Sequence, residues 1–453
     1  MRSLGKWSSV AIMLVIAACA YVDIDLKLWQ ETDRVIEWDV HSYYAYLPAI
    51  FIYKDIELDD SDYSDGQGYY LFWPGELENG EKIIKTTMGV AWLYAPFFFL
   101  SHAYATISDH EANGWSPPYK IGLLIAALFY LTIGLLVIRK ILERLGFNDI
   151  TIALTILLLG TGTNLFFYSS HSGSMSHVFS FFLITLFIHK TIHWYERRSW
   201  SDTISIGLLI GLISLIRPTN ALIIVFFALY GISSPAMIWR RVEMYWSRWP
   251  EILTMALLAL LIWLPQLYYW NYITGSYLFN SYMGERFYFD RPKITEGLFG
   301  FRKGWFIYTP IMALATIGLV FLRKNLEHLR IAIVTFLVLL IYITFSWWCW
   351  WYGGSFGQRS MVDFYSLMSI PLAAFIGRIM LKPVLMIVAF PIMAFLIWLN
   401  VFQTYQYEVG AIHHDAMTFK AYIGTFGSME PLTGSEPFLN YPDYEAAKKG
   451  IAR

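Results

Sequence analysis

The chain has 453 residues, of which 57% are hydrophobic and only 15% are charged, so its composition excludes an ordinary soluble globular protein. The formal net charge of −1 gives no electrostatic indication of a nucleic-acid partner. The two cysteines, Cys19 and Cys349, both lie in apolar segments, which excludes a disulfide framework and a cysteine-rich metal site.

Apolar runs of about 20 residues recur along the chain and predict an all-α polytopic membrane protein. The first run, 7–24, follows the basic stretch "MRSLGK" and fits an uncleaved span whose N-terminus lies inside. Its "IAAC" (Ile16–Cys19) also matches a lipoprotein cleavage box, although a first span explains the segment more simply. Further clear spans are expected at 119–138, 150–168, 177–194, 251–270, 306–322, 331–349, 360–377 and 383–401.

The run 203–232 is too long for one span and is interrupted by "RPTN" at Arg217–Asn220. Proline stops a straight helix there, so we expect two short spans that meet at a break. Broken helices at membrane depth usually line a cavity. The chain is therefore expected to form a bundle of about eleven transmembrane helices.

The run 86–106 is long enough to cross, but the charges of the later loops argue against it. If it does not cross, sixteen Lys and Arg residues in the short segments between spans fall on the inner side, as the positive-inside rule requires. We therefore expect a re-entrant or interfacial helix on the outer face. The chain then divides into a membrane domain, 1–401, with an outer loop at 23–118 that carries juxtamembrane helices, and a short outer tail, 402–453.

The stretch "EWDVHSYYAYLP", Glu37–Pro48, places Asp39 just before a segment with the aromatic and apolar pattern of an interfacial helix. A partly desolvated carboxylate there suits a general base or a metal ligand. The alternative is a solvated acidic loop beside an ordinary aromatic belt. Glu37, His41 and Tyr44 are further candidates for substrate contact.

Cations on the expected outer face indicate an anionic ligand. Lys85 either anchors a helix end at the lipid headgroups or holds a lipid phosphate. The loop 271–305 contains Arg286, Arg291, Lys293, Arg302 and Lys303. In "WWYGGSFGQR", aromatic rings and glycines precede Arg359, a composition that suits a sugar ring or a lipid headgroup as well as a membrane belt.

Two groups of histidines are candidates for metal ligands. His171 and His177 lie in "YSSHSGSMSH" without a nearby carboxylate, so capping or interfacial roles are the simpler interpretation. "HHD", His413–Asp415, has the composition of a chelating group, but on an outer tail such a triplet is more often a solvated turn. A divalent metal is therefore left open as a cofactor, and no phosphate-binding glycine loop of the P-loop type is present.

Together these motifs resemble the GT-C glycosyltransferases, polytopic enzymes that take a sugar from a polyprenyl-phosphate carrier. The resemblance is to the branch of the protein O-mannosyltransferases and aminoarabinose lipid A transferases, and to uncharacterised bacterial members. It is carried by "EWDVHSYY", "KTTMGVAWLY", "GTGTNLFFYSSHSGSMSHVFSFF", "LIRPTN", "FRKGWFIYTP" and "WWYGGSFGQRSMVDFY". Relatives often have a second acid where His171 and His177 stand here, and some have a large C-terminal soluble domain, whereas about fifty residues follow the last expected span of the present sequence.

The resemblance implies an inverting glycosyltransferase on the outer face of a bacterial cytoplasmic membrane, with Asp39, rather than Glu37, as the general base. The implied donor is a polyprenyl-phosphate sugar or a polyprenyl-diphosphate glycan, held through its phosphate by Lys85, Arg217, Arg359 and Arg302. Its prenyl chain is expected beside the interfacial helix and the run 86–106. The acceptor (protein, lipid A or glycan) is not specified. A flippase of a lipid-linked glycan and a non-catalytic assembly factor are the alternatives.

Overall fold

The computed structural model describes residues 5–32, 34–58, 74–432, 434 and 436–451. Among these, eight helical segments are long and apolar enough to cross a membrane. They are α1 (Lys6–Leu26), α4 (Gly89–Ile107), α5 (Pro117–Arg144), α7 (Ser176–Arg197), α11 (Trp249–Thr274), α15 (Glu327–Ser346), η7 with α16 (Arg359–Phe364, Tyr365–Met380) and α17 (Pro383–Glu408). The prediction of an all-α, multi-pass membrane protein is confirmed, whereas the total of eleven spans stays a prediction.

Shorter apolar helices complete the bundle: α6 (Asp149–Thr161), α8 (Trp200–Ile216), η4 with α9 (Pro218–Ile223, Ile224–Leu229) and α14 with η5 (Ile311–Gly318, Leu319–Phe321). The expected span 150–168 is too long, because the helix ends at Thr161 and a loop follows. The expected span 306–322 is interrupted, because α13 (Trp305–Tyr308) ends just before Pro310. The break in 203–232 falls at Arg217, as predicted.

Small elements lie between these helices. They are η1 (Leu28–Gln30), α2 (Asp39–Tyr44), α3 (Tyr46–Pro48), η2 (Ala49–Tyr53), η3 (Phe167–Ser169), α10 (Met237–Ser247), α12 (Ile294–Phe299), η6 (Lys324–Leu326), α18 (Phe419–Thr425), η8 (Glu436–Phe438) and α19 (Tyr444–Lys448). Two short antiparallel strands, β1 (Gly75–Glu76) and β2 (Lys82–Ile83), pair Gly75 with Ile83. The amphipathic helix α10, which buries no residue in the protein, was not predicted.

One end of the bundle gathers the segments that the charge pattern assigns to the inside. Backbone N–H groups at the start of α1 donate to Asp149 at the start of α6, and Arg144 at the end of α5 pairs with Glu196 at the end of α7. Because α8 starts where α7 ends, its C-terminus at Arg217 lies at the opposite end. The structure thus separates the cationic segments from Arg217, while the orientation in a membrane stays a prediction.

The start of α4 is fastened to the end of α8, and this contact places Lys85 near Arg217. A side chain at Gly89 would meet the backbone of Leu215 and Ile216 at 2.6 Å or less, so only glycine fits. Thr87 Oγ1 donates to the Leu215 carbonyl at 2.5 Å, and the Gln266 side chain of α11 accepts the Met88 N–H at 2.8 Å.

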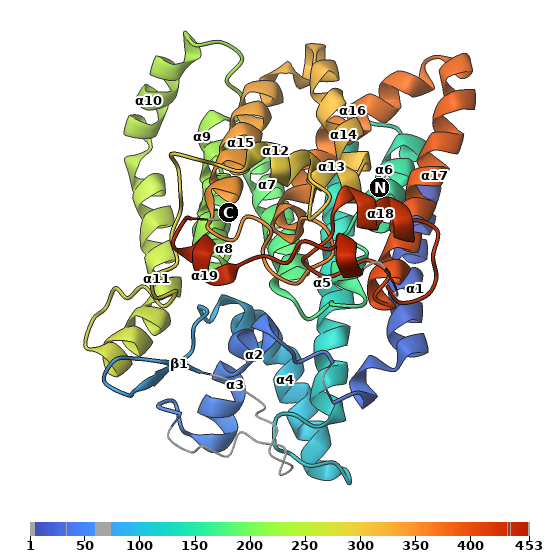
Figure 1. The fold of residues 1–453 in the computed structure, drawn as a ribbon. Coiled ribbons are helices and arrows are strands. Elements are labelled where there is room, and N and C mark those ends of the chain that lie inside the picture. Colours follow the sequence, from blue (N-terminus) through green and yellow to red (C-terminus); the bar gives the residue numbers. More distant parts are fainter. Residues whose placement is uncertain (1–4, 33, 59–73, 433, 435, 452–453) are drawn as a thin grey trace.

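Helix α4 is one continuous helix without a reversal. It packs along α5, and Figure 1 shows it together with α2, α3 and β1 below most of the bundle. That position agrees with an interfacial helix, although α4 is also long enough to cross. The prediction that it does not cross therefore stays a prediction.

Helix α17 continues past the expected boundary at 401 to Glu408, and the tail then folds back onto the bundle (Figure 1). Arg302 donates to the Asn440 carbonyl at 2.9 Å, and Tyr288 donates to the Lys448 carbonyl at 2.7 Å. Ala447 of α19 is fully buried in a cluster with Tyr288, Trp348, Cys349, Trp350 and Trp351. The tail is thus a packed part of the fold.

Candidate active site

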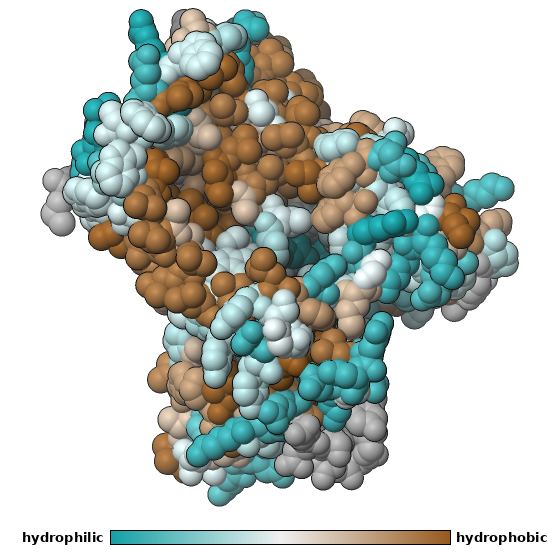
Figure 2. All heavy atoms as spheres, turned by 90° about the vertical axis from the view of Figure 1, so that its left-hand side faces the viewer, coloured by the Kyte–Doolittle hydropathy of each residue, from teal (hydrophilic) through white to brown (hydrophobic). Residues whose placement is uncertain are grey.

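A cavity of about 740 Å³ lies where the start of α2, the α8–η4 break and the segment 347–360 meet. Its charged lining consists of Asp39, Lys85, Arg217, Glu285, Arg286 and Arg359. Figure 2 views the side of the bundle that carries α10 and α11, and it shows a hydrophobic surface interrupted by a hollow with hydrophilic residues inside. Four cations against two carboxylates make the lining suited to an anionic ligand.

Asp39 opens α2 and points its carboxylate at Arg359, with 2.9 Å between Oδ2 and the guanidinium nitrogen NH1. The preceding residue, Trp38, has a φ of 46°, a backbone conformation that residues other than glycine rarely adopt. Strained backbone of this kind is often found at functional sites. Burial raises the pKa of Asp39, but Arg359, Arg217 and Lys85 together outweigh it and hold the pKa below its usual value.

Lys85 reaches across the cavity to the loop 280–289. Its ammonium lies 2.6 Å from Glu285 Oε1 and 5.4 Å from the centre of the Tyr282 ring. Its carbonyl accepts from Ser281 Oγ at 2.5 Å, so both ends of the residue are tied to this loop. The Lys85 side chain is 43% exposed, which leaves its charge accessible to a ligand in the cavity.

Arg217 is the first residue after α8, and the break directs its guanidinium into the cavity. Behind it lies Asp363, whose side chain is fully buried and whose Oδ2 is 3.8 Å from Arg217. Asp363 also accepts from His177 Nδ1 at 2.7 Å and from Asn220 Nδ2 at 2.8 Å. This network joins α7, η4 and η7 and fixes the Arg217 position.

Asp363 was missed in the sequence. It stands in the apolar segment 360–377, and an acid inside such a segment indicates a functional or paired group. That rule identifies Asp363 as important, but the sequence does not name its partners, because they come from segments more than 140 residues away.

Three candidates near Asp39 do not line the cavity: Glu37, His41 and Tyr44. Tyr44 is fully buried among aromatic rings, and its hydroxyl donates to the Gly114 carbonyl at 2.5 Å. His41 packs beside Trp115 at 6.1 Å. The lining residues of this helix are instead Asp39, Ser42 and Tyr43, because successive turns of a helix present residues three to four apart on one face.

The other candidates divide in the same way. Arg286 lines the cavity and stacks on Tyr288 at 4.8 Å. Arg302 does not: it lies over the Trp351 ring at 5.3 Å and holds the tail. His171 stacks on Phe167 at 5.5 Å, and burial lowers its pKa to about 4. His171 and His177 are absent from the lining, and His177 is the buried partner of Asp363.

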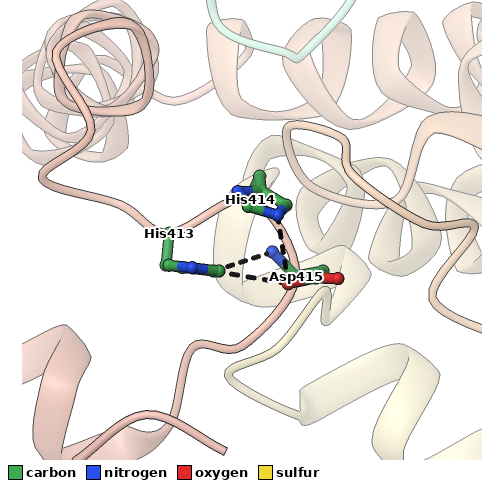
Figure 3. Close-up of side chains that lie close together, drawn as sticks. All are labelled: His413, His414 and Asp415. Atoms are coloured by element: carbon green, nitrogen blue, oxygen red, sulfur yellow. Dashed lines mark hydrogen bonds and ion pairs between the residues drawn. The ribbon is translucent and has the colours of Figure 1, made fainter. Parts of the chain in front are cut away.

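His413, His414 and Asp415 are the one group of three potential metal ligands in the described part of the chain (Figure 3). Asp415 Oδ1 lies 3.3 Å from His413 and 3.4 Å from His414. However, His413 Nδ1 already accepts the N–H groups of Asp415 and Ala416, and the ammonium of the buried Lys303 donates to the His414 carbonyl. Because these hydrogen bonds already occupy His413 Nδ1, the trio fits a tail anchor better than a metal centre. The expected solvated turn is wrong, because Asp415 is 6% exposed.

An apolar wall continues from the charged end of the cavity. It consists of Leu222, Phe287, Phe289, Leu340, Ile343 and Phe364. These residues belong to η4, to the loop before α12, to α15 and to η7. Of the run 86–106, Thr86 lines the cavity and helix α4 does not, so a role of that run in a prenyl groove stays a prediction.

The chain is similar to a solved structure but matches no known protein family. No protein-family model and no curated protein matches the chain. The archaeal oligosaccharyltransferase AglB from Archaeoglobus fulgidus, solved in complex with an inhibitory peptide and a dolichol-phosphate, is similar over 99% of this chain at 10% identity with a TM-score of 0.49. The present chain spans 60% of that structure's length. A likeness of this degree carries no argument about activity.

Proposed function

We propose that the protein is an inverting glycosyltransferase that moves a sugar from a polyprenyl-phosphate or polyprenyl-diphosphate carrier to an acceptor on the outer face of a bacterial cytoplasmic membrane. The observation that carries this proposal is the cavity itself. It brings the ion-paired carboxylate of Asp39 together with Arg359, Arg217 and Lys85, next to an apolar wall. A lipid phosphate needs both the cations and the apolar surface.

In the proposed reaction, the acceptor hydroxyl attacks the anomeric carbon from the face opposite the phosphate. Its proton passes to the Asp39 carboxylate as the new glycosidic bond forms. The bond between the anomeric carbon and the phosphate oxygen breaks, and its electron pair stays on that oxygen. The growing charge on the phosphate is stabilised by Arg359, Arg217 and Lys85.

In this proposal Arg359 has two alternative partners, the Asp39 carboxylate and the phosphate of the donor. Before the donor binds, Arg359 neutralises Asp39. A bound phosphate competes for the same guanidinium, and each hydrogen bond that moves from Asp39 to the phosphate leaves the carboxylate more basic. Donor binding would thus prepare Asp39 to take the acceptor proton.

The apolar wall supplies the place for the prenyl chain. Leu340 and Ile343 lie one helical turn apart on α15, and Phe287 and Phe289 face them from the loop before α12. Each methylene group removed from water contributes about 0.8 kcal/mol. A chain of isoprene units along this wall therefore contributes much of the donor's affinity.

The test is transfer by the purified full-length protein in liposomes that contain a polyprenyl-phosphate sugar and a cell-envelope extract as acceptor source. We expect Asp39→Asn to lose transfer by two orders of magnitude or more while it still binds the donor, because the charge of Asp39 repels the phosphate and its removal does not weaken binding. Full transfer by a folded Asp39→Asn protein would refute the proposal. Movement of a labelled lipid between leaflets without cleavage of the sugar–phosphate bond would instead identify a flippase.

A further inference from the structure

Two aromatic rings, which come from two different segments of the chain, line the cavity together with its cations. Trp348 follows α15, and Tyr444 is the first residue of α19 in the tail. Their ring centres are 6.3 Å apart, and the planes meet at 70°. The tail therefore completes the cavity with a side chain that lies more than 80 residues from Arg359 in the sequence.

The polar ends of both rings are held by the protein. Trp348 Nε1 donates to Glu285 Oε2 at 3.0 Å. The Tyr444 hydroxyl donates to Asp415 Oδ2 at 2.8 Å and accepts from Trp351 Nε1 at 3.4 Å. In a membrane belt, by contrast, the polar ends of such rings point to water and lipid headgroups. Here the rings are fixed in place before any ligand arrives, which reduces the entropy cost of binding.

Glu285 connects the Trp348 ring to the cations of the cavity. The Glu285 carboxylate contacts Lys85 with one oxygen and Trp348 with the other. The indole ring is thus separated from the Lys85 ammonium by the width of one carboxylate. A phosphate at Lys85 places the sugar that it carries next to Trp348 and Tyr444.

Resting on the proposed function, we infer that Trp348 and Tyr444 form the subsite for the sugar ring of the donor, with the apolar C–H face of a pyranose against the aromatic rings. The Glu285 carboxylate and the Tyr444 hydroxyl stand at the edge of this subsite as hydrogen-bonding groups for sugar hydroxyls. The role of His413–Asp415 is then to hold Tyr444 through Asp415, while the buried Lys303 anchors the same stretch of the tail through the His414 carbonyl.

The experiment measures binding of two lipids to the full-length protein in detergent. One is decaprenyl phosphate without a sugar, and the other is decaprenyl-phosphoryl mannose. A second glycosylated lipid, decaprenyl-phosphoryl arabinose, is measured in parallel, because the identity of the sugar is open. We expect Tyr444→Ala to weaken binding of the better-bound glycosylated lipid about five- to tenfold and to leave the sugar-free lipid unchanged.

Two further variants make the result specific. Tyr405→Ala removes a similarly exposed ring, 42% against 38% for Tyr444, on α17 and outside the cavity lining, and should leave the binding of both lipids unchanged. Tyr444→Phe keeps the ring and removes the contact with Asp415, so its affinity for the glycosylated lipid should lie between those of the wild type and Tyr444→Ala. If Tyr444→Ala does not fold, Trp348→Phe, which shrinks the other ring, provides the same comparison.

The outcomes separate the two proposals. If Tyr444→Ala loses affinity for both lipids equally, or keeps its affinity for the glycosylated lipid, the sugar subsite is overturned while the proposed function stands. Reduced transfer with unchanged lipid binding also overturns it, because the ring would then contact the acceptor. Failure of the wild type to bind sugar-free decaprenyl phosphate overturns the proposed function itself.

Discussion

The carboxylate of Asp39 lies 2.9 Å from the guanidinium of Arg359, although the two residues are far apart in the sequence. Asp39 begins the helix after the first membrane segment, and Arg359 begins the segment that leads into α16. An ion pair at the wall of a cavity, with the Asp39 side chain 42% exposed, is accessible to a ligand. The predictions below depend on how this pair and its neighbours respond when one member is changed.

The first prediction concerns pH. In the proposed reaction the active form of Asp39 is the carboxylate. The pKa of Asp39 lies below the ordinary value of about 3.9, so transfer by the wild type should stay constant as pH falls from 7 towards 4. Arg359→Gln removes the largest of the charges that lower this pKa. Burial then acts with less opposition, and the acid limb of the pH profile should move to higher pH.

The measurement is kcat/KM against pH for the wild type and Arg359→Gln in liposomes. The absolute rate of the variant falls because a phosphate ligand is lost, but the position of the limb is independent of that loss. Arg302→Gln, which removes a cation outside the cavity lining, should leave the limb where it is. An unshifted limb in Arg359→Gln would show that Asp39 is not the titrating base.

The second prediction concerns Lys85 and its competition between Glu285 and a ligand. Glu285→Gln removes the negative partner, while the amide oxygen can still accept from Trp348. The freed ammonium should bind decaprenyl phosphate roughly two- to fivefold more tightly, the range of a partly exposed ion pair. Lys85→Met should weaken the same binding about 10- to 100-fold.

Titration of decaprenyl phosphate against the purified variants measures both effects. Lys293→Met, which removes the partner of Glu296 outside the cavity lining, serves as the matched lysine control. Weaker binding by Glu285→Gln would contradict the competition and would assign Glu285 a direct role in holding the lipid.

The membrane class of the protein and most of its long helices could be predicted from the sequence, because an apolar run of span length has few alternatives. The positions of Asp39, Lys85, Arg217 and Arg359 around one cavity are a different matter. The helix break and the expected outer-face cations indicated Arg217, Lys85 and Arg359, the resemblance to a family selected Asp39 over Glu37, and periodicity did not bring the four together. The break at Arg217 was predictable from Pro218, since proline cannot continue α8.

Other parts of the site depend on long-range packing that no local pattern specifies. Tyr43 and Tyr44 are adjacent and chemically identical, and only the phase of α2 decides that Tyr43 faces the cavity. Tyr444 enters the lining because the tail folds back, and its anchors at Asp415 and Lys303 are ordinary polar residues in the sequence. The triplet His413–Asp415 was therefore expected to form a solvated turn, although Asp415 is buried.

The third prediction concerns the buried network behind Arg217. Asp363 accepts from His177 and Asn220 and faces Arg217 at 3.8 Å, with no exposure to water. Asp363→Asn removes the negative charge and leaves Arg217 without its counterion. Loss of one partner of a buried ion pair typically costs about 3–5 kcal/mol, so the variant should unfold at a clearly lower temperature.

Thermal unfolding in detergent, followed by tryptophan fluorescence, measures this cost. Glu327→Gln breaks an exposed acid–arginine pair with Arg330 and should leave the unfolding temperature nearly unchanged. If Asp363→Asn is as stable as Glu327→Gln, then Asp363 does not hold the α7–η4–η7 junction together.

The last prediction concerns the apolar wall. Phe289 lies in the cavity lining, is 49% exposed, and stacks on Phe287 at 5.3 Å. If this wall carries the prenyl chain, Phe289→Ala should weaken binding of decaprenyl phosphate about tenfold but should scarcely affect a phosphate with a single isoprene unit, which does not extend along the wall. Phe395→Ala provides the control, because Phe395 is similarly exposed at 50% on α17 and lies outside the lining. Equal effects of Phe289→Ala on the long and the short lipid would place the prenyl chain elsewhere, since only a side chain along its path can distinguish the two lengths.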